Sequence, residues 1–472
     1  MPKSHFGLIG LGVMGENLVL NAESNGFSSV VYNRTYAKTE DFLNGRGKGK
    51  NIQGATDLQD FVSKLERPRR ILMMVKAGPA VDAVVEQISP YLEEGDLLID
   101  GGNSDYHDTE RRVKQLESKS FGFIGMGVSG GAKGALEGPS MMPGGTKSSY
   151  DAIESLVTKM AAQVEDGPCV TYIGPGGSGH LVKTVHNGIE YGIEQILAEA
   201  YDLMKRVKGM SGDQMADVLA QWNATEELES YLVEITEVCL RTKDPEDGAD
   251  LVEKIMDQAG QKGTGLWTVV TALQMGASVP TIYASLNGRV MSSMKPQRVQ
   301  AEGILNGPSI QDFDLGTPDD GMSPLMDAVV LSCVASYAQG MELLRISSND
   351  LDYNLHMPSI AQIWKGGCII RARLLKRIQD AFNADPQLHN LMIDPWFADQ
   401  INRRLPGLAQ VVSGAAKSGI PVPCFSSTLD YINSYRTGRL PQNLVQAMRD
   451  CFGSHTYQRV DKEGTFHTEW LD

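Results

Sequence analysis

The sequence predicts an α/β domain, then a large all-helical domain and a C-terminal tail. Short apolar strands alternate with helical patterns in the first third, and apolar residues recur with a helical period from residue 179 onward. Glycine and proline interrupt that period after about residue 433. We therefore expect three parts, residues 1–177, 178–433 and 434–472, in a chain long enough for more than one hydrophobic core.

The first predicted strand ends in a glycine motif. Residues 6–9 are apolar, the next six read Gly10-Leu11-Gly12-Val13-Met14-Gly15, and a helical pattern covers residues 16–24. A strand, this GxGxxG spacing and a helix, in that order, are typical of a Rossmann-like dinucleotide-binding domain. The glycines let backbone N–H groups approach a pyrophosphate at the helix N-terminus. The alternative is an ordinary glycine-rich loop.

The second strand, residues 29–32, ends at Asn33-Arg34-Thr35. A site for NAD usually places Asp or Glu here, to accept a hydrogen bond from the ribose 2′-hydroxyl. The amide, guanidinium and hydroxyl of this chain instead suit a 2′-phosphate. We therefore predict NADP as the cofactor, with the alternative that Arg34 only faces solvent at a strand end.

Two further strands, residues 70–75 and 97–100, continue the alternation. Ligands of such sheets bind beyond the carboxyl ends of the strands. Residues at these ends are therefore expected beside the cofactor: Val75, Lys76, Ala77 and Asn103.

A glycine-rich stretch, residues 125–145, follows a strand at 121–125 and precedes one at 170–173. It holds eight glycines and two prolines and shows no secondary-structure period, so we expect a loop. Within it, Ser129-Gly130-Gly131 could form a nest of N–H donors for a carboxylate. The alternative is a flexible connector.

A helical pattern from residue 179 to about 206 carries polar residues at the spacing of one helix face. These are Lys183, His186, Asn187, Glu190 and Tyr191. A separate apolar stripe can hold the helix in a core: Val182, Val185, Ile189, Ile193 and Ile196. A helix anchored on one side, with convergent titratable groups on another, is a candidate catalytic site.

The rest of the second domain shows repeated helical patterns. They cover residues 212–221, 226–240, 249–258, 264–275, 279–291, 325–346, 358–366 and 370–383, and the tail adds one short helix at 443–451. Lys262 lies in a glycine-flanked loop and Arg289 just inside a helical pattern. Taken alone, each is an ordinary surface base.

Composition narrows the class of partner. The formal net charge of −15 argues against nucleic acid or an anionic membrane, and we find no apolar run long enough to span a bilayer. Six scattered cysteines lack zinc spacing, and the eight histidines lack an HExxH pair. We therefore expect a cytoplasmic protein with reduced thiols and no metal.

Seven motifs, taken together, resemble the decarboxylating 6-phosphogluconate dehydrogenase family over essentially the full length. They are GLGVMG (10–15), NRT (33–35), DGGNS (100–104), GVSGG with GPSMMPGG (127–145), KTVHNGIEYG (183–192), QKGTG (261–265) and RDCFGSHTY (449–457). The resemblance implies a Rossmann-like coenzyme domain and an all-helical domain. It also implies a homodimer in which each tail reaches into the partner's active site.

The resemblance also implies residue roles. Lys183 would be the general base and later acid, and Glu190 would protonate the enediol intermediate. The residues implied to contact the sugar acid are Asn103, Ser129, Gly130, Gly131, His186, Asn187 and Tyr191. Those implied to hold the 6-phosphate and neighbouring oxygens are Lys262 and Arg289, with Arg449 and His455 from the other subunit's tail.

The implied reaction is NADP-dependent oxidation of 6-phosphogluconate at C3, loss of CO₂ and protonation at C1, which gives ribulose 5-phosphate. A lysine base needs a lowered pKa, obtainable from burial and nearby cationic groups. Seven residues separate Lys183 from Glu190, a helical rise of roughly 10 Å. Their side chains can therefore approach a small sugar acid from either end.

The chain departs from the family pattern at two places. Ala132-Lys133 stands where acidic residues are usual, and Ile193-Glu194-Gln195 replaces a commoner Asp-Met-Gln. Two alternatives remain: a β-hydroxyacid dehydrogenase of the same superfamily, and a non-catalytic NADP(H)-binding module. The first should lack the tail and the phosphate-binding bases, and the second would not need Lys183 and Glu190.

Overall fold

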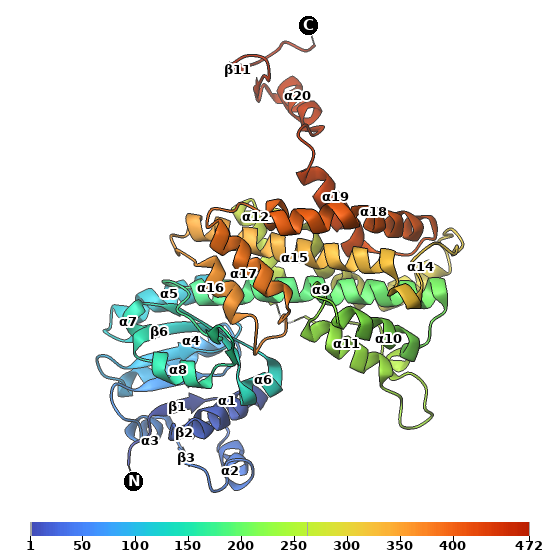
Figure 1. Cartoon of the computed structure of the whole chain (residues 1–472). Helices are drawn as coiled ribbons and strands as arrows, with labels where there is room; N and C mark the ends of the chain where they lie inside the picture. Colours follow the sequence, from blue (N-terminus) through green and yellow to red (C-terminus); the bar gives the residue numbers. More distant parts are fainter. Residues whose placement is uncertain (1, 262, 472) are drawn as a thin grey trace.

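A computed structural model describes residues 2–261 and 263–471. Its N-terminal domain is built on a seven-stranded sheet in the order β3-β2-β1-β4-β5-β6-β7 (Figure 1). The strands are β1 Phe6–Ile9, β2 Ser29–Tyr32, β3 Ile52–Gly54, β4 Arg70–Met73, β5 Leu97–Asp100, β6 Gly122–Ser129 and β7 Ser140–Gly145. All neighbours pair in parallel except β6 and β7. The sheet confirms the predicted Rossmann-like domain, with β1 between β2 and β4.

Helices cover the sheet and close two apolar cores. They are α1 Val13–Ser24, α2 Tyr36–Asn44, α3 Leu58–Ser63, α4 Pro79–Ile88, α5 Tyr106–Glu117, α6 Gly131–Glu137, α7 Lys147–Asp151 and α8 Glu154–Met160, with a short 3₁₀ helix Ser89–Tyr91. Neighbouring residues of β1 belong to different cores, Leu8 to one and Ile9 to the other. Successive strand side chains point to opposite faces, so a strand covered on both faces must be apolar throughout.

The expectation of a loop at residues 125–145 was wrong. This stretch forms most of β6, all of α6 and all of β7. Its glycines allow close packing: a Cβ at Gly127 would lie 2.4 Å from the Cβ of Lys183. The strand expected at 170–173 is also wrong, because only isolated bridges form there, at Val170 and Gly174. A short hairpin, β8 Gln163–Val164 and β9 Gly167–Pro168, precedes it.

The helical domain begins with α9, Ser178–Lys208. Its other helices are α10 Gly212–Asn223, α11 Tyr231–Arg241, α12 Thr264–Met275, α13 Pro280–Ser293, α14 Lys295–Glu302, α15 Ser323–Asp350, α16 Met357–Ile363, α17 Leu374–Ala384, α18 Pro395–Lys417 and α19 Pro423–Tyr435, with 3₁₀ helices Leu251–Lys254, Pro318–Asp320 and Leu391–Ile393. The helix expected at 249–258 is only the first of these 3₁₀ turns, whereas α14, α18 and α19 were not anticipated.

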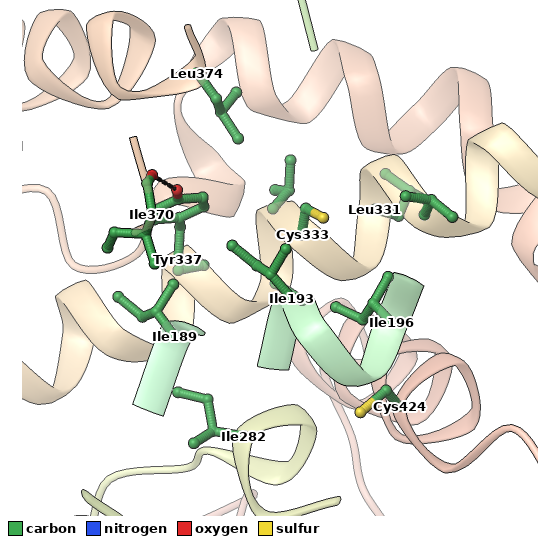
Figure 2. Close-up of a cluster of buried hydrophobic side chains, with 14 of the residues drawn as sticks. Ile189, Ile193, Ile196, Ile282, Leu331, Cys333, Tyr337, Ile370, Leu374 and Cys424 are labelled. Carbon is green, nitrogen blue, oxygen red and sulfur yellow. Dashed lines mark hydrogen bonds between the residues drawn. The ribbon is translucent and has the colours of Figure 1, made fainter. Parts of the chain in front are cut away.

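Helix α9 is anchored by its predicted apolar stripe. All five of those residues are buried, and Figure 2 shows Ile189, Ile193 and Ile196 among apolar side chains of α15 and neighbouring segments. The hydroxyl of Tyr337 on α15 donates to the carbonyl of Ile370 at 2.7 Å, and this bond holds the segment between α16 and α17 against α15. The anchoring fixes α9 against rotation and so orients its polar face.

Helix α15 is as long and apolar as a membrane-spanning helix, so the expectation that the chain contains no such run was wrong. Its apolar window is 83% buried inside the domain, where it packs against α9 and α18. Here the apolar composition serves the protein core.

The tail extends away from the helical domain (Figure 1). It comprises α20 Gln442–Gly453 and a hairpin of β10 Tyr457–Gln458 and β11 Thr465–Phe466. The buried Asp450 carboxylate closes this unit: it accepts from the Thr456 and Thr468 amides at 2.8 and 3.1 Å. The His467 ring and the Trp470 indole N–H lie 2.9 and 2.8 Å from it. The tail therefore has its own internal order.

Candidate active site

The polar face of α9 brings four predicted residues together. Lys183 Nζ donates to Asn187 Oδ1 at 2.7 Å and lies 3.4 Å from His186 Nδ1. The Asn187 amide donates to Thr264 Oγ1 on α12 at 2.9 Å. The Glu190 carboxylate lies 3.6 Å from His186 Nδ1. An amine, an imidazole, an amide and a carboxylate thus converge as their helical spacing predicted.

Lys183 has the lowered pKa that a lysine base needs. Its side chain is 5% exposed, and this burial lowers its pKa below the usual 10.5. The expected cationic neighbours are not what lowers it. The titratable groups that act on the pKa of Lys183 are Glu190 and Cys368, and both oppose the shift.

His186 is held as a neutral ring. It is fully buried, and burial together with the nearby Lys183 amine places its pKa well below 6.5. Its Nε2 lies 3.3 Å from Ser129 Oγ at the end of β6, and its ring meets Trp364 edge-on with centroids 5.6 Å apart. A neutral imidazole in this position can donate or accept a hydrogen bond without adding charge to the site.

The pKa of Glu190 lies above that of an ordinary carboxyl group. Burial is the main cause that raises its pKa to about 7. The nearby Glu194 carboxylate adds to this effect, while Lys183 and Arg289 act to lower the pKa. At neutral pH a substantial fraction of Glu190 is therefore protonated. A base with a lowered pKa and an acid with a raised pKa, on one helix face, form a pair suited to proton transfer.

Arg289 lies at one end of this face, on α13. Its guanidinium stacks 3.7 Å from the centroid of the Tyr191 ring and donates to the Gly260 carbonyl at 2.7 Å. It also pairs with the Glu194 carboxylate on α9. Thus Tyr191, predicted as a substrate contact, also supports the arginine.

The GxGxxG turn has the geometry that a dinucleotide needs. Gly10 has φ of +103°, and a Cβ there would lie 2.4 Å from the Met74 carbonyl oxygen. A Cβ at Gly15 would lie 2.1 Å from the Gly10 carbonyl oxygen. A Cβ at Gly12, in contrast, would meet no described atom within 4 Å. Chain packing explains the first and third glycines, whereas the second leaves room for a ligand at the start of α1.

The remaining predicted cofactor residues lie around this turn. Asn33 Oδ1 accepts from the Leu11 N–H at 3.1 Å, so Asn33 braces the turn. Arg34 and Thr35 are exposed after β2. Val75 packs near Gly10, and the segment of Val75, Lys76 and Ala77 joins β4 to α4.

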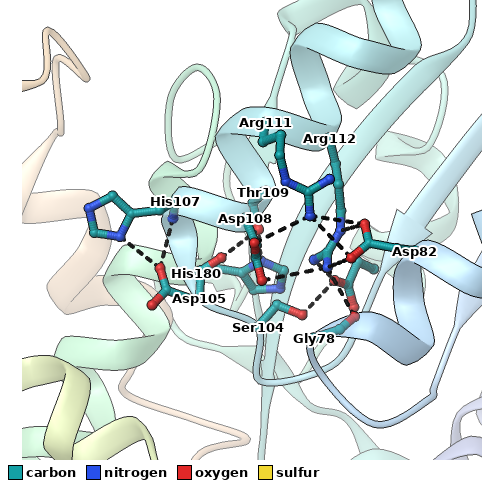
Figure 3. A network of polar contacts seen from close by, with 11 residues as sticks. Gly78, Asp82, Ser104, Asp105, His107, Asp108, Thr109, Arg111, Arg112 and His180 are labelled. Atoms are coloured by element: carbon teal, nitrogen blue, oxygen red, sulfur yellow. Dashed lines mark hydrogen bonds and ion pairs between the residues drawn. The ribbon is translucent and has the colours of Figure 1, made fainter.

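A buried arginine holds the segment that carries Asn103. Arg112 donates to Asp82 at 2.8 Å and to the Gly78 carbonyl at 3.0 Å (Figure 3). It also lies 3.6 Å from Asp100. Asp100 in turn accepts from Ser104 Oγ at 2.6 Å. The turn after β4 and the turn after β5 are therefore fixed to one guanidinium.

The same network reaches α9. Thr109 on α5 lies 2.6 Å from Nδ1 of the buried His180, one turn before Lys183 (Figure 3). A Cβ at Gly125 of β6 would lie 2.8 Å from this ring. Asn103, exposed after β5, thereby has a defined position relative to the polar face of α9.

The Ser129-Gly130-Gly131 segment links β6 to α6. Ser129 is buried, and both glycines have positive φ, +114° and +61°. A Cβ at Gly130 would lie 2.6 Å from the Gly367 carbonyl oxygen. The glycines therefore permit a close approach of the segment after α16. Ala132 and Lys133, one of the two departures, are exposed on α6.

Three residues of the site were given no role from the sequence: Thr264, Trp364 and Gly127. Each acts on α9 from a segment distant in the chain. No local pattern marks such a contact, although the glycine-rich character of β6 was a partial signal.

Of the residues that the structure describes, two predicted ones are not brought to this face. Arg449 and His455 lie in the tail, where Arg449 donates to Gln446 and the His455 ring packs against Phe452. Lys262 lies outside the described residues. Within residues 2–261 and 263–471, no group of three His, Cys, Asp or Glu side chains is arranged to hold a metal ion.

The fold and the site together define a class: a two-domain dehydrogenase with a Rossmann-like coenzyme domain and a lysine-bearing helix. Family comparisons are more specific. The model for the NAD binding domain of 6-phosphogluconate dehydrogenase matches residues 5–174, and the model for the 6-phosphogluconate dehydrogenase C-terminal domain matches residues 179–470. The chain belongs to the 6-phosphogluconate dehydrogenase family.

Individual relatives match this chain over its full length. The chain is 57% identical to a decarboxylating 6-phosphogluconate dehydrogenase of Synechococcus elongatus, with 100% of both chains covered. It is 49% identical to the NADP(+)-dependent, decarboxylating enzyme of Bacillus subtilis, again with 100% of both covered. The solved Plasmodium falciparum 6-phosphogluconate dehydrogenase, studied with NADP+ and with 6-phosphogluconate, has a TM-score of 0.94 at 43% identity, covering 99% of this chain and 100% of that one.

Proposed function

We propose that this protein oxidises and decarboxylates 6-phosphogluconate with NADP, giving ribulose 5-phosphate, CO₂ and NADPH. The observation that carries the proposal is the pairing of Lys183 and Glu190 on α9, with pKa values shifted toward each other. Membership of the family specifies the sugar acid and the reaction. The β-hydroxyacid alternative would leave the matched C-terminal domain and tail unexplained.

The residues around α1 fit a dinucleotide. The space beside Gly12 and the N–H groups at the start of α1 suit a pyrophosphate, and Arg34 with Thr35 suits a 2′-phosphate. Val75, Lys76, Ala77 and Asn103 would flank the nicotinamide half. When bound there, NADP supplies the acceptor for the hydride that leaves C3.

Lys183 performs the first proton transfer. Its lowered pKa supplies a neutral amine, which takes the proton of the C3 hydroxyl. Asn187 holds this amine through a 2.7 Å hydrogen bond, so its lone pair has a defined direction. The protonated amine then supports the enolate that forms when CO₂ departs from the 3-keto acid, a step in which the β-carbonyl accepts the electrons.

Glu190 performs the second proton transfer. Its raised pKa keeps a proton available at neutral pH, and that proton goes to C1 of the enediol. His186, 3.6 Å from this carboxyl group, remains neutral and holds the sugar together with Ser129 and Asn187. Gly130, Gly131, Asn103 and Tyr191 complete the contacts to the sugar acid.

The 6-phosphate is bound by Arg289 and Lys262 and by Arg449 and His455 of a second copy of this chain. Exposed apolar residues support such an exchange. The tail exposes Leu444, Val445, Met448 and Phe452, and α12 and α13 expose Leu266, Leu273 and Tyr283. A largely apolar groove of about 890 Å³ beside α13 and α19 is a candidate seat for a partner segment. The protein is accordingly a homodimer, and its free cysteines suit the cytoplasm.

The test is an assay of the two products. NADPH formation and CO₂ release should be equimolar with 6-phosphogluconate, and unphosphorylated gluconate should give far lower kcat/KM. Oxidation without CO₂ release, or equal use of both sugar acids, would contradict the proposed function.

A further inference from the structure

The arginine proposed to bind the substrate phosphate is already paired with a carboxylate of this chain. Glu194, on α9, forms an ion pair with the Arg289 guanidinium on α13. Glu194 follows Glu190 by four residues and Tyr191 by three, so all three lie along one side of α9.

We propose that Glu194 is an internal counter-ion that competes with the substrate's 6-phosphate for Arg289 and thereby sets the affinity for phosphorylated sugar acids. This inference rests on the proposed function, because it takes Arg289 as a phosphate ligand. It assigns Glu194 a role in specificity, with no direct part in the proton transfers.

The contacts of Arg289 engage both terminal nitrogens of its guanidinium. Stacking on Tyr191 covers one face of the guanidinium, the Gly260 carbonyl takes Nη1, and the Glu194 carboxylate takes Nη2. Bidentate phosphate binding needs two adjacent donors of this fork. An incoming phosphate must therefore displace the carboxylate or share the guanidinium with it.

Exposure indicates that displacement is feasible. The Arg289 side chain is 15% exposed and the Glu194 side chain 39%, so the acid lies nearer to solvent. A partly exposed pair is weak enough to exchange for a phosphate with up to two negative charges. A carboxylate that stays nearby repels that phosphate, and both effects weaken substrate binding.

Glu194 also acts on the proposed acid. Its charge is one of the causes that raise the pKa of Glu190, which Lys183 and Arg289 act to lower. His186 on α9 and Cys368 on the segment after α16 also face Glu190. Removing the Glu194 charge should therefore lower the pKa of Glu190 and move the alkaline limb of the kcat profile to lower pH.

The experiment is steady-state kinetics of full-length Glu194→Gln with 6-phosphogluconate. We expect KM to fall about fivefold, the scale of a partly exposed ion pair. Inhibition by inorganic phosphate, competitive with substrate, should strengthen by a similar factor. Asp202→Asn is the matched control, since Asp202 lies on α9 and pairs with Arg206 away from the site. It should leave KM unchanged.

A double-mutant cycle distinguishes competition between Glu194 and the phosphate from support of Arg289 by Glu194. Glu194→Gln should have no effect on KM in an Arg289→Ala background. Glu194→Met provides a second variant should the amide perturb folding. An unchanged or higher KM in both Glu194 variants of an active enzyme would overturn this inference alone, since Glu194 would then support Arg289. A wild-type protein inactive on 6-phosphogluconate would overturn the proposed function and this inference with it.

Discussion

Lys183 donates from its Nζ to Asn187 Oδ1 over 2.7 Å, one helical turn further along α9. Asn187 is itself held by Thr264, so the lysine is oriented from a second helix, α12. A buried amine held by a neutral amide retains a lowered pKa, whereas a carboxylate in the same place would reverse that shift.

Asn187→Asp tests this relationship. A carboxylate beside Nζ favours the charged amine, so the pKa of Lys183 should rise. Because the base must be neutral, the acid limb of the kcat profile should move to higher pH, and kcat at pH 7 should fall at least tenfold. The pH dependence of kcat measures the effect. An unmoved acid limb would show that another group is the base.

Glu190 should titrate near neutral pH. Its pKa is about 7, and Lys183 is among the groups that lower it. Carbon-13 NMR of labelled glutamate side chains should therefore give a midpoint near that value, and Lys183→Met should raise the midpoint further. A Glu190 midpoint in the ordinary range of an exposed carboxyl group would contradict the assigned role as proton donor.

Gly12→Ala should impair cofactor binding without impairing folding. A Cβ at Gly12 meets no described atom within 4 Å, so the melting temperature should be unchanged while KM for NADP rises at least tenfold. Calorimetric titration with NADP checks the cofactor affinity, and thermal unfolding checks the stability of the fold. A normal NADP affinity would place the pyrophosphate elsewhere.

Gly127→Ala, unlike Gly12→Ala, should lower the stability of the fold. Its Cβ would lie 2.4 Å from the Cβ of Lys183, so β6 or α9 must shift. Overpacking of this kind costs about 1–3 kcal/mol of unfolding free energy. We expect a lower denaturant midpoint together with a lower kcat, because the shift moves the base. Unaltered kcat would mean that the Lys183 amine is insensitive to the position of β6.

Much of the site could be predicted from the sequence because it is local. The polar and apolar stripes of α9 follow from helical spacing, and GxGxxG after a strand identifies the coenzyme turn. The loop expected at 125–145 was wrong because the glycines of β6 have no side chains to alternate. They are required by contacts with Lys183 and His180, more than fifty residues away in the chain.

The contacts that other segments of the chain make with the site could not be predicted. Thr264, Trp364 and Arg112 reach the site only through the packing of α12, the segment after α16, and α5. The pKa shifts of Lys183 and Glu190 likewise depend on burial, which appears only in the folded domain.

The central claim is that Lys183 and Glu190 carry separate proton transfers. Rapid-mixing measurement of NADPH formation in Lys183→Met and Glu190→Gln tests it most directly. Glu190→Gln should give a burst of about one NADPH per site followed by slow turnover, because oxidation precedes the blocked protonation. Lys183→Met should give no burst. A burst from Lys183→Met, or its absence from Glu190→Gln that still binds substrate and NADP, would contradict this division of roles.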